Sequence, residues 1–190
     1  ALLTKLERLQ RLRFIDQAPP INLAARMKPS ALTVIDLNDA EDKVKNIAIA
    51  WLLNKIFKLK LAGQQAKTMI VIEEAHSFVS LETREKMAAT LEMLKVIARR
   101  GRKRWLSLVF VSQQPGHLPG EIFELCNTRI THAMRSQANL KAIQRTSTAT
   151  PEHLAKIPGL APGEALITSP KLPHPILTKI RPAKTKKLKF

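Results

Sequence analysis

Two adjacent carboxylates at the end of an apolar run are the first candidates for chemistry in this sequence. Glu73 and Glu74 directly follow the run Met69-Ile-Val-Ile72. One carboxylate of such a pair can hold Mg²⁺, usually through a water molecule, while the next orients or deprotonates an attacking water. A strand that simply ends in solvated acids would show the same pattern. The pair therefore predicts a site only if other polar groups reach the same place.

A second apolar run ends in polar residues of a complementary kind. Ser112 and Gln113 follow the run that ends at Val111. A polar amide beside two carboxylates can hydrogen-bond a terminal phosphate or the attacking water. The segment Gln113-Gln-Pro-Gly116 also has good turn chemistry, so a simple turn is the alternative interpretation. Both interpretations can hold together.

A run of cations lies between these two segments. Six Lys and Arg side chains fall within ten residues, which exceeds what the C-terminal dipole of a helix requires. Guanidinium groups suit phosphate because their planar fork binds it bidentately. A solvated charge run remains the alternative. The cations are Lys95, Arg99, Arg100, Arg102, Lys103 and Arg104.

Three short apolar runs, separated by helical patterns, must position these side chains. The runs are residues 32–37, 69–72 and 106–111, and runs of this length are typical of buried strands. Helices are predicted over 41–61, with Val44, Ile47, Ala48, Trp51, Leu52, Ile56 and Phe57 inward, and over about 83–100, with Met87, Leu91, Leu94 and Ile97 or Ala98 inward.

The rest of the chain alternates in the same way. An amphipathic helix is expected over 2–14, a short helix over 118–126, a strand over 129–134, a polar helix over 137–145, and final strands over 164–168 and 176–180. Buried strands separated by helices predict an α/β fold with a mostly parallel sheet and helices on both faces. Ligands bind at the carboxyl ends of the strands in such sheets, where Glu73, Glu74 and Gln113 fall.

Composition limits the partners and the compartment. The 190 residues carry 32 Lys and Arg against 15 Asp and Glu, a formal net charge of +17. Such a charge favours a polyanionic partner, with nucleic acid ahead of an anionic membrane surface and of a merely basic surface. The single Cys126 excludes an internal disulfide and indicates a cytoplasmic protein. No apolar run approaches the roughly 20 residues of a membrane span. The five His residues are scattered, so no metal-ligand cluster is expected.

Taken together, these motifs resemble the HerA/FtsK superfamily of hexameric DNA-pumping ATPases, and HerA-like helicases most of all. The motifs that carry the resemblance stand in the family's order: residues 69–76, with Ala75-His76 after the carboxylates, then 97–103, 108–115 and 125–128. Residues 32–37 and 163–167 also fit, so the likeness covers nearly the whole chain. Family members more often have Asp-Glu at the carboxylate pair.

The resemblance implies a RecA-like P-loop NTPase core that binds ATP and Mg²⁺. Glu73 and Glu74 match the Walker B pair, with Glu73 on Mg²⁺ through water, and Gln113 matches the sensor after the following strand. Arg102, or Arg99 as second choice, matches an arginine that acts on a neighbouring subunit's nucleotide. The resemblance further implies a homohexamer that grips duplex DNA by its backbone, DNA end processing, and a NurA-type nuclease as partner.

One required motif is missing from these 190 residues. A P-loop has the pattern Gly-x-x-x-x-Gly-Lys-Ser/Thr and opens a helix, so that backbone N–H groups cradle the phosphates. The nearest segment, Gly63-Gln-Gln-Ala-Lys-Thr68, lacks the second glycine and leads into a predicted strand. The fold is therefore expected to be incomplete, with the P-loop strand and helix upstream, and the chain alone is expected to have negligible ATPase activity.

Three regions are expected: a helical lead-in over 1–30, the ATPase core over 31–170, and a basic tail over 171–190. The tail could contact phosphates, lie against a neighbouring subunit, or only solubilise the protein. The leading hypothesis is the C-terminal part of a HerA-type DNA translocase. The alternatives are a conjugation-type DNA-pumping ATPase, which a membrane segment upstream would favour, and a non-catalytic nucleic-acid-binding module.

Overall fold

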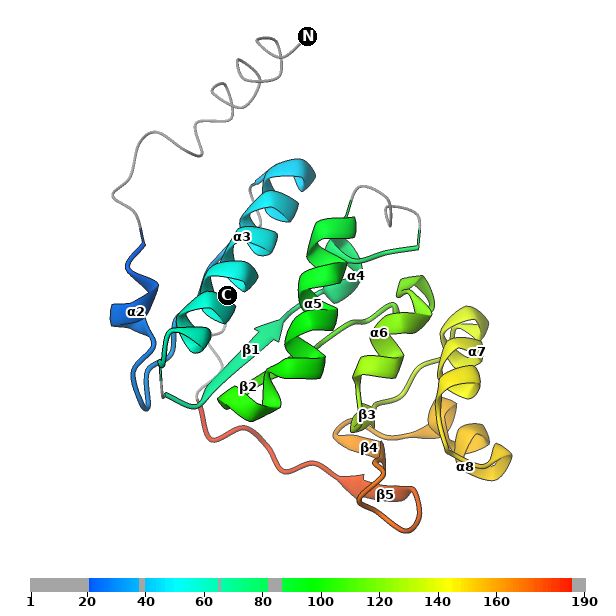
Figure 1. The fold of residues 1–190 in the computed structure, drawn as a ribbon. Helices are drawn as coiled ribbons and strands as arrows, with labels where there is room; N and C mark the ends of the chain where they lie inside the picture. The colour runs from blue at the N-terminus through cyan, green and yellow to red at the C-terminus, as the bar shows by residue number, and fades with distance from the viewer. Residues whose placement is uncertain (1–20, 38–39, 65, 82–86, 186–190) are drawn as a thin grey trace, which may run out of the picture. The chain divides into compact units, whose positions relative to one another are not determined.

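A computed structural model describes residues 21–37, 40–64, 66–81 and 87–185. The chain divides into two compact units, which meet in sequence at Ser112 and Gln113 (Figure 1). The helix predicted over 2–14 lies outside the described residues. Each unit has its own strands and its own buried side chains, so each is described by itself.

The first unit is a two-stranded parallel sheet with helices packed beside it. Strands β1 and β2 pair in the register Thr68↔Leu106 to Ile72↔Phe110, so both strands end at the same edge. The parallel arrangement predicted for the two apolar runs is thereby confirmed. The elements are α2 (Leu23–Arg26), α3 (Asp42–Leu61), β1 (Thr68–Ile72), α4 (Ala75–Phe78), α5 (Ala88–Arg100), η1 (Arg102–Arg104) and β2 (Leu106–Phe110).

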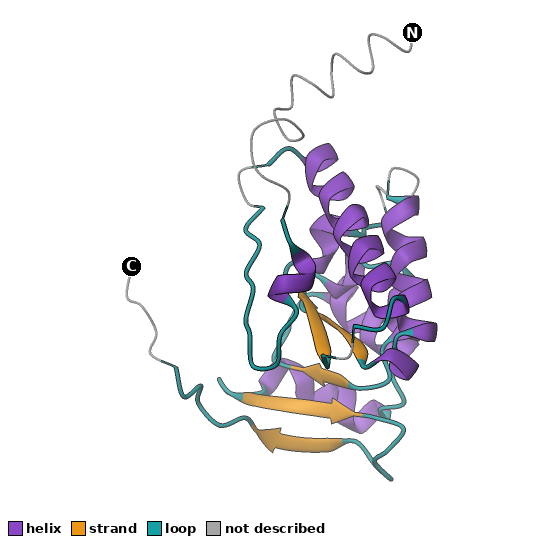
Figure 2. Ribbon diagram, turned by 60° about the vertical axis from the view of Figure 1, so that its left-hand side comes forward, coloured by secondary structure: helices purple, strands orange, loops and turns teal. Residues whose placement is uncertain are grey.

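Helices α3 and α5 lie side by side and supply most of the core of this unit (Figures 1 and 2). Thr90 of α5 is buried and donates its hydroxyl hydrogen to the backbone carbonyl of Asn46 in α3, at 3.4 Å. The predicted inward face of α5 is confirmed. Its buried apolar side chains, with Met87 just before the helix, are Leu91, Leu94 and Ile97.

The predicted inward face of α3 is only partly right. Val44, Ala48 and Phe57 are buried as expected, but Ile47 and Trp51 are 47% and 46% exposed. Apolar and polar residues are spread around the whole circumference of the helix, so its periodicity could not select the buried face.

The strand predicted over residues 32–37 is wrong. This segment has no regular secondary structure, and Leu32 and Val34 are 89% and 79% exposed. An apolar run becomes a strand only where a neighbouring strand accepts its backbone hydrogen bonds, and no described strand pairs with this one. None of the residues 32–37 is buried against the described part of the first unit.

The second unit is built around an antiparallel three-stranded sheet in the order β3-β4-β5 (Figure 2). Its registers are Arg129↔Thr168 to Thr131↔Leu166 and Glu164↔Lys179 to Ile167↔Ile176. The parallel pairing therefore does not extend to these strands. The elements are η2 (Pro115–His117), α6 (Gly120–Leu125), β3 (Arg129–Thr131), α7 (Gln137–Thr146), α8 (Pro151–Lys156), η3 (Ile157–Gly159), β4 (Glu164–Thr168) and β5 (Ile176–Lys179).

Most elements of this unit occur where the sequence predicts them. Strand β3 is shorter than predicted and ends at Thr131, because only three of its residues face β4. Helix α8 was not predicted, although Thr150-Pro151 is a recognisable start: the Thr150 hydroxyl accepts from the backbone N–H of His153, and Pro151 occupies the first helical position. Among the described residues, no helix is long and apolar enough to cross a membrane.

Candidate functional site

The carboxyl-terminal edge of the β1–β2 sheet holds the predicted carboxylates. Glu73 directly follows β1 and is exposed, and Glu74 is partly buried. The backbone N–H of Val111 donates to the carbonyl of Ile72 at 2.9 Å, so the segment after β2 stays paired with the end of β1. Both carboxylates therefore lie at this edge of the sheet, as the sequence predicts.

The backbone at Glu74 turns the chain sharply away from the sheet. Glu74 has φ 48° and ψ 48°, a left-handed conformation that costs an L-residue roughly 1–2 kcal/mol. Two hydrogen bonds hold the turn: the N–H of Ala75 donates to the carbonyl of Val111, and the N–H of Ser77 donates to the carbonyl of Glu74. Strained backbone of this kind persists where surrounding contacts over-determine it, which is common at functional sites.

His76 connects the Glu74 carboxylate to the neighbouring strand end. Its Nδ1 atom lies 3.3 Å from Oε2 of Glu74 and 3.1 Å from Oγ of Ser112. The Glu74 side chain is 44% exposed and the His76 side chain 20%. The imidazole therefore lies against Oε2, which is buried, while the Glu74 side chain as a whole stays partly exposed.

This edge has the groups that a hydrated Mg²⁺ and an attacking water require. Mg²⁺ keeps several waters and takes only one or two protein carboxylates together with substrate phosphates, which suits the exposed Glu73. The described residues contain no group of three or more His, Cys, Asp and Glu side chains that could enclose a metal alone. The chemistry open to Glu73 and Glu74 is thus assistance to a phosphate-bound ion and a water.

Gln113 directly follows Ser112 and begins the second unit. It is exposed, and its backbone carbonyl accepts a hydrogen bond from Nδ2 of Asn139 at 3.4 Å. A turn is present one residue later than the predicted segment 113–116: the N–H of His117 donates to the carbonyl of Gln114, and Pro115 starts the short helix η2. The turn leaves Gln113 exposed, so the turn and a sensor role for Gln113 can hold together.

The two candidate arginines lie at the opposite edge of the first unit. Arg99 is in the last turn of α5 and Arg102 is in η1, just before β2 begins, and both are exposed. The five residues of β2 span roughly 16 Å. Because β1 and β2 are parallel, that length separates Arg102 from the edge that holds Glu74. Neither arginine can serve the carboxylates of its own chain.

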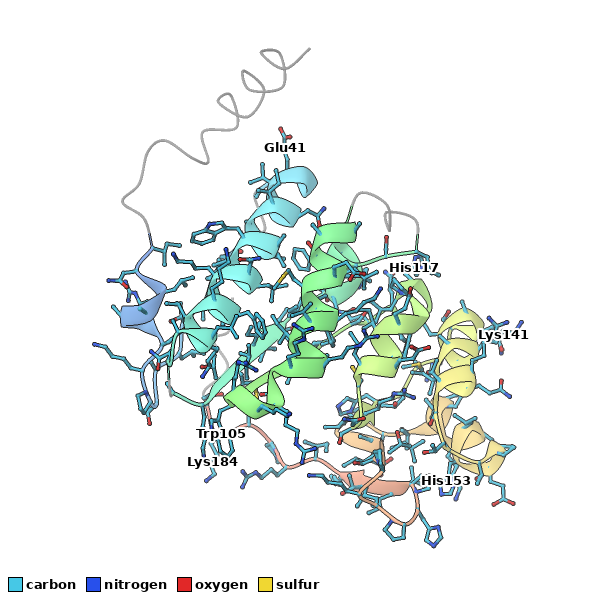
Figure 3. The ribbon with its side chains drawn as sticks, in the orientation of Figure 1. Glu41, Trp105, His117, Lys141, His153 and Lys184 are labelled. Carbon is cyan, nitrogen blue, oxygen red and sulfur yellow. The ribbon has the colours of Figure 1, made fainter. Side chains whose placement is uncertain are left out.

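Arg104 is placed differently from Arg102. The Arg104 guanidinium lies 5.9 Å from the centre of the Phe57 ring and donates to the carbonyl of Arg100 at 3.4 Å. Trp105 follows in a left-handed conformation and is 59% exposed, with the Lys67 ammonium 4.9 Å from its ring centre (Figure 3). The Arg104 side chain is thus partly buried, whereas Arg102 is exposed, as Arg100 and Lys103 also are.

Burial shifts the pKa of three titratable groups that are not among the candidate site residues. Burial lowers the pKa of Lys60, whose ammonium donates to the backbone carbonyls of Ala66 and Gln64 in the loop before β1. Burial also raises the pKa of the Cys126 thiol, an effect that the nearby Arg129 partly opposes. Burial lowers the pKa of Arg129, which donates to the carbonyl of Phe123 at 2.9 Å. These groups support loops rather than a site.

The rejected P-loop candidate is confirmed as something else. Gly63 follows the end of α3 with φ 97°, and Thr68 is the first residue of strand β1. A phosphate cradle needs a helix at this point. Nothing in the described part of this segment can therefore bind a triphosphate in the P-loop manner.

Two polar residues contact candidate site residues in ways that the sequence does not predict. His76 was noted beside the carboxylates, but its contact with Ser112 joins residues 36 positions apart. Asn139 was not singled out at all, because a polar residue near the start of a polar helix carries no signal. The contact of His76 with Ser112 follows only from the pairing of β1 with β2. No local sequence pattern predicts the contact of Asn139 with Gln113.

Comparison with known proteins gives matches over most of the chain. Residues 24–174 match the family described as "Helicase HerA-like C-terminal". The "DNA double-strand break repair helicase HerA" of Pyrococcus furiosus is 26% identical over 195 residues, which covers 84% of this chain and 34% of that protein. The chain spans about a third or less of the length of the first curated relatives it matches.

Solved structures of similar fold point the same way. VirB4 of Thermoanaerobacter pseudethanolicus superimposes with a TM-score of 0.63 at 21% identity, covering 78% of this chain and 40% of that one. The genome packaging NTPase B204 from Sulfolobus turreted icosahedral virus 2, solved with ATP-gammaS, superimposes with a TM-score of 0.61 at 17% identity, covering 86% of this chain and 74% of that one. The fold is thus an incomplete RecA-like α/β core.

Proposed function

This chain belongs to the family of HerA-like helicase C-terminal domains, and on that premise we propose that it is the hydrolytic part of an ATP-driven DNA translocase. The observation that carries the proposal is the paired edge of β1 and β2. There Glu73 and Glu74 emerge beside Ser112, and the next residue in the chain is Gln113. In parallel α/β sheets this edge is where ligands bind.

Each of these residues has a proposed role. Glu73 holds Mg²⁺ through a water, and Mg²⁺ would neutralise charge on the phosphates when bound. Glu74 orients the attacking water and accepts its proton, with His76 fixing the direction of its carboxylate. Gln113 hydrogen-bonds the γ-phosphate or the attacking water, and so responds to whether ATP is intact. Charge and geometry of this kind account for most catalysis in phosphoryl transfer.

The triphosphate itself is bound elsewhere in the complete protein. No P-loop pattern occurs in the 190 residues, and the carboxylate edge alone offers no backbone cradle for phosphates. We assign the P-loop to a part of the protein upstream of this chain. The resolved B204 complex with ATP-gammaS supports nucleotide binding by a protein of this fold.

A neighbouring copy of the chain completes the site. Arg102, with Arg99 as second candidate, lies too far from Glu74 to act in its own chain, which supports a role on the adjacent subunit's nucleotide. Head-to-tail contacts of this type close into rings, here a homohexamer. The two opposite edges of the first unit, one with carboxylates and one with guanidinium groups, would then meet between copies.

Duplex DNA is the proposed substrate of the ring, gripped by its phosphate backbone. The net charge of +17 supports a polyanionic partner, and the exposed Lys171, Lys179, Arg181 and Lys184 place part of that charge in the region after residue 170. We further propose a cytoplasmic protein with the core over 31–170 and the basic tail over 171–190. DNA end processing, with a NurA-type nuclease as partner, completes the proposal.

Hydrolysis by the longest natural protein that contains this chain tests the proposal. ATP turnover is measured with and without linear duplex DNA, at two salt concentrations. We expect hydrolysis that rises with DNA, and a stimulation that weakens as salt competes for the phosphates. DNA binding without any ATP hydrolysis would instead establish the non-catalytic nucleic-acid-binding alternative.

A further inference from the structure

The turn that carries Gln113 is held by one side chain from α7. The Oδ1 atom of Asn139 accepts a hydrogen bond from the backbone N–H of Gly116 at 2.9 Å. The Nδ2 atom of the same amide donates to the backbone carbonyl of Gln113 at 3.4 Å. Both ends of the four-residue segment 113–116 are therefore tied to a single amide group.

Gly116 permits this close approach. A Cβ atom at that position would lie 2.9 Å from Oδ1 of Asn139 and 3.2 Å from the backbone carbon of Ala138. Contacts below 3.0 Å force a displacement, and the backbone of α7 leaves little room for one. The missing side chain thus brings the turn against α7 and lets the amide reach both bonds.

Helix α7 is a firm support for this contact. Ile143 is buried, and the Thr146 hydroxyl donates to the carbonyl of Ala142 at 2.8 Å. At the other end, the N–H of Leu140 donates to the carbonyl of Ser136. A group held by a helix positions its partners more accurately than one held by a loop.

We propose that Asn139 is a positioning residue that fixes the backbone of Gln113, so that the Gln113 amide is aimed for reading the γ-phosphate. This inference rests on the sensor role proposed for Gln113. Asn139 holds the backbone from which the Gln113 side chain extends, so the position of that backbone limits where the side chain can reach. Misplacing a reacting group by about 1 Å can cost as much as 100-fold in rate.

The test uses the longest natural protein that contains this chain, with ATP turnover and hydrogen exchange measured on each variant. Asn139→Ala removes both bonds, whereas Asn139→Asp keeps the acceptor for Gly116 and loses the donor to Gln113. Gln144→Ala, an exposed amide on the same helix, is the matched control. His117, which ends η2, and Lys141, on α7, mark the two elements in Figure 3.

For Asn139→Ala we expect kcat to fall about tenfold or more, with KM for ATP changed less than about threefold. Amide exchange of residues 113–118 is expected to accelerate in Asn139→Ala. In Asn139→Asp the Gly116 amide stays protected while kcat still falls. Gln144→Ala should behave as wild type in both measurements.

A double variant separates this inference from the proposed function. If Asn139 acts through Gln113, Gln113→Ala and the double variant Gln113→Ala/Asn139→Ala lose the same amount of kcat. Wild-type turnover in Asn139→Ala, or additive losses in the double variant, would overturn the positioning role. Wild-type turnover in Gln113→Ala would instead remove the sensor role of Gln113 from the proposed function.

Discussion

The Nδ1 atom of His76 lies 3.1 Å from the Oγ atom of Ser112, although 36 positions separate the two residues in the sequence. The contact joins the turn after β1 to the segment after β2, and the same Nδ1 atom lies 3.3 Å from Oε2 of Glu74. Strand pairing brings the two segments together, and the imidazole then links them through side chains. The imidazole therefore contacts both the Glu74 carboxylate and the segment after β2.

Removal of this link should slow hydrolysis without abolishing it. His76→Ala leaves Glu74 in place but frees its carboxylate to rotate, so we expect kcat for ATP to fall about tenfold with little change in KM. Steady-state ATPase assays of the full protein measure both. Ser77→Ala, an exposed neighbour, is the control. Wild-type kcat in His76→Ala would show that the contact does not orient Glu74.

Mixing two inactive variants tests whether Arg102 acts between subunits. Arg102→Ala and Glu74→Gln should each lose most ATP turnover, because each removes one half of every site. In random one-to-one rings, about a quarter of the sites pair an intact Glu74 with an intact Arg102 from the next subunit, so activity should return to about that level.

Arg100→Ala is the matched control, because it removes an exposed cation from the last turn of α5 without touching η1. It should retain turnover alone. A mixture of Arg102→Ala and Glu74→Gln that stays inactive would argue that Arg102 does not complete a neighbour's site.

Lys60 should make stability depend on pH in a particular direction. Burial lowers its pKa in the folded protein, so the folded state binds fewer protons than the unfolded state between the folded pKa and the ordinary value of 10.5. The contribution of Lys60 to stability is therefore smallest at neutral pH and rises with pH through that window. Relative to Lys60→Met, the wild type should gain free energy of unfolding as pH approaches 10.5.

At neutral pH, Lys60→Met should still destabilise the protein by about 1–3 kcal/mol, because the charged hydrogen bonds to Ala66 and Gln64 are lost. Urea unfolding at a series of pH values gives both quantities. Lys58→Met, an exposed lysine of the same helix, provides the baseline. A stability difference between Lys60→Met and wild type that does not change with pH would contradict the assignment.

Cys126 should be a slow thiol. Its pKa is raised by burial, and Arg129 only partly offsets this, so less thiolate is present at neutral pH than in an exposed cysteine. We expect alkylation by iodoacetamide at pH 7.5 to be about tenfold slower than in the urea-unfolded protein. Mass spectrometry of the modified fraction over time measures the rate. Equal rates in the two states would contradict the burial of the thiol.

The strand ends were predictable from sequence because burial leaves a local signature. The run 69–72 is apolar throughout and 106–111 is broken only by Ser107, and the residues that follow them change abruptly to carboxylate, hydroxyl and amide. The run 32–37 is also mostly apolar, although it includes Thr33 and Asp36, yet it is exposed coil, since hydrophobicity records a tendency toward burial and not the presence of a pairing partner. A strand forms only where a second segment of the chain lies beside it and accepts its backbone hydrogen bonds.

The remaining features depend on contacts between distant residues. The antiparallel pairing of β3 with β4 joins residues nearly forty positions apart, and apolar runs alone do not distinguish it from parallel pairing. The hydrogen bond from Asn139 to the backbone of Gln113 joins residues 26 positions apart, and asparagine is a common residue on helix surfaces. Sequence reasoning could therefore name the candidate side chains but not the groups that hold them in place.

The most direct test of the account is Glu74→Gln in the full protein, with ATP binding and ATP turnover measured separately. The amide keeps the size of the side chain but cannot accept a proton from water, so kcat should fall at least about 100-fold while the affinity for ATP changes less than about threefold. Glu124→Gln, an exposed glutamate of α6, should turn over ATP as the wild type does. Unchanged turnover in Glu74→Gln would contradict the assignment of this edge as the site of hydrolysis.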